Sequence, residues 1–145
     1  MIVIDFPKPS FKTKEENSQR YIWDALRKKW LLLTPEEWVR QNFIAYMIQV
    51  KQYPCEMIAV EKAVQIAELK KRFDIVVFKE MKPWMIVECK EIDVALNSSA
   101  FEQLSRYNMS LSGSYLVITN GNYTKGWYVK EGSFKEIKHL PEWDE

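Results

Sequence analysis

Two acidic residues and a lysine lie in two neighbouring apolar segments, at a spacing that can bring their charges together. Asp74 belongs to the segment 72–78, and Glu88 and Lys90 belong to the segment 84–90. Both segments are rich in β-branched and aromatic residues, which predicts strands. The five residues 79–83 between them are polar and have a length used by hairpins. Two carboxylates and an amine are therefore expected at one end of a hairpin.

The register of this hairpin follows from its symmetry. If the connection is symmetric about Met81, Asp74 falls directly opposite Glu88. Side chains alternate along a strand, so Glu88 and Lys90 share one face. The alternative is an ordinary surface hairpin with a cross-strand ion pair.

Such a charged group is costly in an apolar sheet unless it is paired or binds a cation. Mg²⁺ prefers oxygen ligands and keeps several waters, so Asp74, Glu88 and the backbone carbonyl of Cys89 could supply its protein ligands. Mn²⁺ is expected to substitute. A metal-bound water is a nucleophile for phosphodiester hydrolysis, and Lys90 could orient it or offset charge on the phosphate. The residue types predict a metal-dependent nuclease site.

The segment 97–111 is predicted to form a helix that covers the sheet. Phe101, Leu104 and Leu111 define an apolar face, and Gln103 and Tyr107 lie four residues apart on a neighbouring face. That edge could overhang the carboxylates. Taken singly, Tyr107 could instead pack in the core and Gln103 could be a solvated amide.

These motifs together resemble the PD-(D/E)xK nuclease superfamily, and most closely the N-terminal nuclease domain of type I restriction enzyme R subunits. The resemblance implies a restriction-endonuclease-like α/β fold that hydrolyses DNA. It also implies that Asp74 and Glu88 are metal ligands, with Lys90 as the catalytic lysine. Gln103 and Tyr107 match a Gln-x-x-x-Tyr element and would be accessory site residues. The motifs are residues 73–74, 87–90 and 103–107.

The resemblance extends to residues 34–40, 60–62 and 119–121 and covers roughly residues 20 to 130. Two positions depart from the family pattern. Phe73 stands where the superfamily has its proline, and Cys89 occupies the variable middle position. Neither departure removes a charged group.

Composition indicates one globular domain: 145 residues with 47% hydrophobic content and six Trp. Residues 1–20 are polar and are expected to form an arm or irregular lead-in, followed by a nuclease-like domain over residues 21–145. No apolar stretch has the length of a membrane span and no leader is evident, so a cytoplasmic protein is expected. Cys55, Cys89 and the single His139 lack zinc-ligand spacing and give little support to a Ser-His-Asp triad.

The net charge of +1 is low for a protein that binds nucleic acid by bulk electrostatics. Two local basic clusters could still contact phosphates, although such runs are often only solvated surface. They are Arg27, Lys28 and Lys29, and Lys70, Lys71 and Arg72.

The first predicted helix begins at a capping Thr34 followed by Pro35 in the first turn, with Glu37 placed to complete a capping box. First-helix acids reach the metal in some similar nucleases, but capping is the favoured role for Glu37. One helical stripe is expected to pack against the sheet. It comprises Val39, Phe43, Met47 and Val50.

Further strands are predicted at residues 57–64, 115–118 and 125–130, with a turn at 120–121. The first of these strands places Glu61 near the hairpin as an accessory residue. The order helix, three strands, helix, strands predicts a mixed sheet flanked by helices.

Gly121 and Gly126 have the spacing of a P-loop, but Trp127 and Tyr128 follow where Lys and Ser or Thr are required. No ATP motor is expected within this sequence. Three hypotheses follow: a free-standing nuclease acting on DNA, a nuclease subunit directed by an ATPase or specificity partner, and a non-catalytic nucleic-acid-binding or assembly module. The complete set of Asp74, Glu88 and Lys90 favours the first two.

Overall fold

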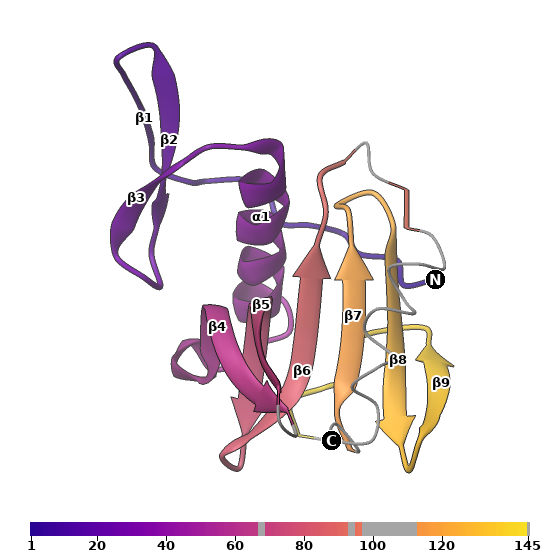
Figure 1. Ribbon diagram of the computed structural model, residues 1–145. Helices are drawn as coiled ribbons and strands as arrows, with labels where there is room; N and C mark the ends of the chain where they lie inside the picture. The colour runs from indigo at the N-terminus through magenta and orange to yellow at the C-terminus, as the bar shows by residue number, and fades with distance from the viewer. Residues whose placement is uncertain (67–68, 93–94, 97–112, 145) are drawn as a thin grey trace.

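The protein is described by a computed structural model that covers residues 1–66, 69–92, 95–96 and 113–144. These residues form a three-stranded sheet, one α-helix and a six-stranded sheet (Figure 1). The helix expected over residues 97–111 lies outside the described part of the chain. No helix among the described residues is long and apolar enough to cross a membrane.

The three-stranded sheet is antiparallel, with β1 (Thr13–Glu16), β2 (Gln19–Asp24) and β3 (Lys29–Leu32) in sequence order. Asn17 and Ser18 connect β1 to β2 with φ of 52° and 65°, the left-handed pair that suits a two-residue hairpin. The lead-in expected for residues 1–20 therefore contains one strand and the start of a second. Figure 1 shows this sheet beside the helix, on the side away from β7, β8 and β9.

The helix α1 (Pro35–Gln49) starts where the sequence predicts. Thr34 is its N-cap, and the Thr34 hydroxyl oxygen accepts a hydrogen bond of 3.0 Å from the backbone N–H of Glu37. Three residues of the predicted stripe, Val39, Phe43 and Met47, are buried as expected. Val50 was wrongly included: it is the C-cap of the helix, and its residue surface is 52% exposed.

The larger sheet has the order β4-β5-β6-β7-β8-β9 and is mixed, because β6 and β7 pair in parallel while all other pairs are antiparallel. The expected mixed sheet and its strands are confirmed, and β9 was not anticipated. The strands are β4 (Ile58–Ile66), β5 (Leu69–Lys79), β6 (Lys82–Cys89), β7 (Tyr115–Thr119), β8 (Thr124–Lys130) and β9 (Ser133–Ile137). A short 3-10 helix, Cys55–Met57, precedes β4.

The β5–β6 hairpin has the predicted register but a tighter connection. The pairs Ile75↔Val87 and Val77↔Met85 are those expected from symmetry about Met81. The predicted five-residue connection is wrong: a register shift between Val77 and Phe78 brings Lys79 opposite Lys82 and leaves only residues 80–81 in the turn. Both turn residues have positive φ, which matches the twist of a two-residue hairpin.

Both faces of the central strands are buried, which explains their nearly continuous apolar sequences. On one face, Phe43 and Met47 of α1 pack with Val77, Val87 and Val117. On the other face lies a second cluster that contains Val76, Ile86, Leu116 and Ile118. The described residues thus confirm one flanking helix, and the hairpin is held firmly enough to position its charged end.

Phe43→Ala should lower the free energy of unfolding by about 3–5 kcal/mol, because a fully buried ring is removed from the α1–sheet contact. Val50→Ala, at the exposed end of the same helix, should change it by less than about 0.5 kcal/mol. Urea denaturation of both variants measures the difference. Equal losses would contradict the assignment of α1 to the core.

Candidate active site

Asp74 and Glu88 meet at the end of the β5–β6 ladder. Beyond the last regular pair, Ile75↔Val87, the two carboxylates accept hydrogen bonds from backbone N–H groups of the opposite strand. The backbone N–H of Asp74 donates to Glu88 Oε1 at 3.3 Å, and the backbone N–H of Cys89 donates to Asp74 Oδ2 at 2.8 Å. The structure therefore brings the two predicted acids together.

The position of Glu88 makes its charged form costly. Burial, followed by the negative charge of Asp74, raises the pKa of Glu88 from 4.5 to about 7. The backbone N–H of Asp74 and the ammonium groups of Lys71 and Lys90 oppose this rise in pKa. The positive charges near the two acids therefore do not fully offset the cost of ionising Glu88.

Lys90 follows directly after β6. Its backbone N–H donates to the carbonyl oxygen of Thr119 at 2.8 Å, which ties it to the end of β7. The residue is half-buried. Its charge acts on Glu88 and also on Glu36, so the ammonium group lies within electrostatic reach of both carboxylates.

Arg40 of α1 lies among the acids and was missed by sequence reasoning. Its Nη1 atom lies 3.2 Å from Asp74 Oδ1 and 3.3 Å from Glu61 Oε1. Its Nη2 and Nε atoms contact the Glu37 carboxylate at 2.7 and 3.1 Å. The Arg40 side chain is only 8% exposed. The available signal was the position of Arg40: it directly follows Val39 of the buried stripe and lies one helical turn after Glu37.

Glu37 is used structurally. Its backbone N–H completes the cap, but its carboxylate binds Arg40 and accepts a hydrogen bond of 3.0 Å from Gln41 Nε2. The residue is buried. Glu61, expected as an accessory residue, shares Arg40 with Asp74 and also contacts Arg27. The structure thus places Glu61 beside the site but commits its charge to two arginines.

Arg27 has an internal role that its place in a basic cluster did not predict. Its Nε atom binds Asp24 Oδ2 at 2.6 Å, and its Nη1 atom binds Glu61 Oε2 at 3.1 Å. Burial tends to raise the pKa of Asp24, but the backbone N–H and guanidinium of Arg27 outweigh it, and the pKa is lowered. This carboxylate is therefore firmly ionised beneath Arg27.

Glu36, in the first turn of α1, is a second residue that sequence reasoning overlooked. Its pKa is raised, first by partial burial and then by the charge of Asp74, while Arg40 and Lys90 act in the opposite direction. Its carboxylate therefore senses the same charges as Glu88. Glu36 is an exposed residue, which leaves it accessible from solvent.

Of the remaining predicted residues that the structure describes, only Lys71 is found near the two acids. Lys71 lies near Glu88, with its Nζ 5.3 Å from the centre of the Phe73 ring. Four others are exposed: Lys28, Lys29, Lys70 and Arg72. Gln103 and Tyr107 lie outside the described residues.

The donors present suit a hard divalent cation such as Mg²⁺. Asp74 and Glu88 offer carboxylate oxygens, and Mg²⁺ needs few protein ligands because it keeps several waters. A soft metal is not favoured, because burial, with Asp74 next, raises the pKa of the Cys89 thiol well above its usual value. Within the described residues no three His, Cys, Asp or Glu side chains form a ready metal-binding group. The two carboxylates with bound waters are the set that fits.

Comparison with known proteins gives one match. A family model described as type I restriction enzyme R protein N terminus matches residues 35–141. No curated protein and no solved structure matches the chain. The matched span includes α1, the β5–β6 hairpin and therefore Glu36, Arg40, Asp74, Glu88 and Lys90.

The raised pKa of Glu88 predicts a pH-dependent stability. Below pH 4.5 Glu88 is protonated in the folded and the unfolded chain; between pH 4.5 and about 7 the unfolded chain loses its proton first, so rising pH favours unfolding. Above about pH 7 the penalty is constant. Glu88→Gln removes this penalty. Without added metal, the denaturant midpoint of the variant minus that of the wild type should therefore increase between pH 5 and 8. The exposed Glu80→Gln should not gain, and parallel curves for all three proteins would refute the assignment.

Arg40→Met should lower the free energy of unfolding by about 3–5 kcal/mol, because Glu37, Glu61 and Asp74 lose a buried cation. Millimolar Mg²⁺ should recover part of this loss by binding the freed carboxylates. Chemical denaturation with and without Mg²⁺ tests both effects. The exposed Arg72→Met is the matched control, and a loss no larger than its own would contradict the central place of Arg40.

Proposed function

The chain belongs to the family of type I restriction enzyme R protein N termini, and on that premise we propose that it is a Mg²⁺-dependent deoxyribonuclease. The observation that carries this proposal is the close approach of Asp74 and Glu88 at a buried position, where burial and then the charge of Asp74 raise the pKa of Glu88 to about 7. Two acids held together at this cost, with Lys90 in reach, are typical of a catalytic site.

The side chains divide the chemistry between them. Asp74 and Glu88 would hold the cation, with the Cys89 carbonyl as a further ligand. Mg²⁺, or Mn²⁺ in its place, would supply Lewis acidity and lower the pKa of a water. Lys90 orients the attacking water or offsets charge on the scissile phosphate. Glu36 is placed to accept a proton or to extend the ligand set from α1.

Arg40 and Glu61 act as positioning residues. Arg40 fixes Asp74 Oδ1 at 3.2 Å while Asp74 Oδ2 is fixed by the Cys89 N–H at 2.8 Å, so the Asp74 carboxylate has one orientation. Gln103 and Tyr107 remain proposed accessory residues from the family resemblance. The substrate proposed is DNA, and an ATPase or specificity partner is proposed to direct it.

A non-catalytic nucleic-acid-binding or assembly module is the second candidate. One observation favours it: Arg40 already neutralises Asp74 and would compete with a cation for the same oxygen. In that case the acids and arginines would be a structural network. Metal binding distinguishes the two candidates, because only the nuclease needs it.

Cleavage of supercoiled, linear duplex and single-stranded DNA with Mg²⁺ or Mn²⁺ tests the proposal. Glu88→Gln and Lys90→Gln should each reduce the rate on the order of 100-fold or more, because each removes a group that acts on the reacting phosphate or its water. The matched controls are Glu80→Gln and Lys82→Gln at the opposite, exposed end of the same hairpin.

The control variants should retain wild-type rates, and EDTA should abolish cutting. Cutting that persists in EDTA, or that survives both site substitutions, would refute the nuclease. Mg²⁺ binding without cutting would indicate that a partner is required. Neither binding nor cutting would favour the non-catalytic module.

A further inference from the structure

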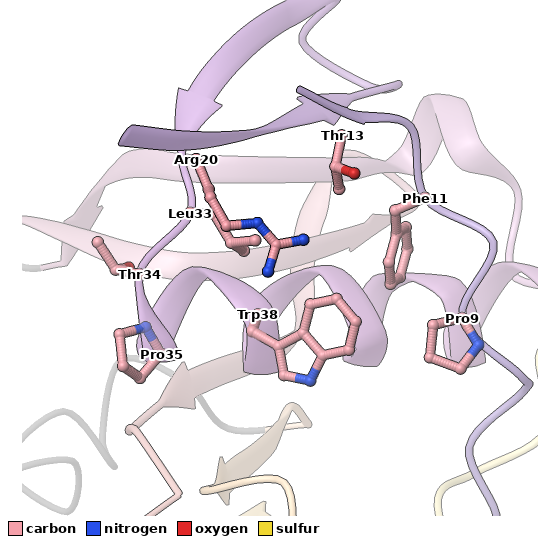
Figure 2. Close-up of a pocket in the computed structure, with 8 residues that line it drawn as sticks. All are labelled: Pro9, Phe11, Thr13, Arg20, Leu33, Thr34, Pro35 and Trp38. Carbon is pink, nitrogen blue, oxygen red and sulfur yellow. The ribbon is translucent and has the colours of Figure 1, made fainter. Parts of the chain in front are cut away.

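A second concave site lies between the three-stranded sheet and α1. It is a cavity of about 600 Å³, within the size range of small-molecule pockets. Figure 2 shows side chains converging on it from the N-terminal segment, from the sheet and from the first turn of α1. Those that matter here are Phe11, Thr13, Arg20, Leu33, Pro35 and Trp38.

Two aromatic rings make one wall of this cavity. Phe11 and Trp38 meet edge to face, with ring centroids 5.5 Å apart and planes at 80°. Both residues are half-buried, so part of each ring remains accessible. With Pro35 and Leu33 nearby, the rings form a corner that a flat apolar group can fill.

Arg20 supplies the charge. Among the residues that the structure describes, no carboxylate pairs with its guanidinium, whereas Arg27 and Arg40 each bind several. Arg20 is exposed, and in Figure 2 its guanidinium points towards Trp38 and Phe11. A planar, permanently charged fork beside two aromatic rings suits a phosphate joined to a flat base.

We propose that this cavity binds one nucleotide of a single-stranded nucleic acid. The base stacks on Trp38 in the corner made with Phe11, and the adjoining phosphate binds Arg20. An unpaired strand is required, because a base within a duplex has both faces covered by its neighbours and cannot enter a pocket.

The cavity and the carboxylates lie on different sides of α1. Trp38 and Arg40 are two residues apart, which is about 200° around a helix. A helix with its side chains is about 10–12 Å across, so a bound strand would have to pass around α1 to reach from the cavity to the carboxylates. The assignment of this strand as a substrate rests on the proposed nuclease function, but binding itself does not require cleavage.

Binding is measured with a fluorescently labelled 12-mer of single-stranded DNA in EDTA, so that no cutting occurs. Trp38→Leu should weaken binding about 5- to 150-fold, the range of aromatic stacking on a base. Arg20→Gln should weaken it about 10-fold or more, because a charged hydrogen bond to the phosphate is lost. Controls are Lys130→Gln, an exposed cation at the end of β8, and Trp30→Leu, a half-buried indole elsewhere on the three-stranded sheet. Both controls should bind within about twofold of the wild type.

A 12-mer that carries only sugar and phosphate separates the two contacts. On this abasic strand Trp38→Leu should cause no further loss, whereas Arg20→Gln should still weaken binding. If Trp38→Leu weakens both strands equally, the base-stacking assignment is overturned. Thermal unfolding of each variant establishes that it is folded. If Trp38→Leu does not fold, Arg20→Gln, at an exposed residue, tests the pocket alone.

The outcomes are separable from those of the nuclease. Wild-type binding by both Arg20→Gln and Trp38→Leu, alongside normal Mg²⁺-dependent cutting, overturns the nucleotide pocket and leaves the nuclease intact. The predicted loss of binding in a protein that neither binds Mg²⁺ nor cuts DNA supports the pocket and counts against the nuclease. Equal affinity for duplex and single-stranded 12-mers also overturns the inference.

Discussion

The contact between Arg40 and the acids around it is the interaction on which the rest of the site depends. A single guanidinium joins Glu37 of α1, Glu61 of β4 and Asp74 of β5, and it is almost fully buried. Buried charges are tolerated only when their partners are well placed, so this one residue fixes how α1 sits on the sheet. These ion pairs hold the helix and the hairpin together at their charged ends.

Arg40 does not neutralise the whole group. Asp74 is held by Arg40 and by the N–H of Cys89, whereas Glu88 has a weak backbone contact at 3.3 Å and the more distant charges of Lys71 and Lys90. Glu88 is therefore the carboxyl group that loses most by ionising: burial, followed by the negative charge of Asp74, raises its pKa to about 7. A divalent cation would relieve the same repulsion, and this supports the metal-dependent nuclease proposed above.

The three-stranded sheet contributes to the site from outside it. Arg27, after β2, contacts Glu61 while anchored on Asp24, and so stabilises the acid that shares Arg40. Arg20, seven residues earlier and within β2, is instead exposed to solvent and lines the cavity beside Trp38. The two arginines differ because, among the described residues, carboxylates pair with Arg27 and none pairs with Arg20.

The sequence by itself determined the strands β4 to β8 of the larger sheet, the capped start of α1 and the proximity of Asp74 to Glu88. These rest on local signals: apolar strand runs, a Thr-Pro cap and a register fixed by alternation. The tight two-residue turn, the exposure of Val50 and the strands β1, β2, β3 and β9 escaped prediction, because bulges, helix ends and short strands carry weak local signals. Only the tertiary structure decided what Arg27, Arg40 and Glu36 do, because the partners of a charged side chain come from distant segments, and sequence spacing does not encode which carboxylate it meets.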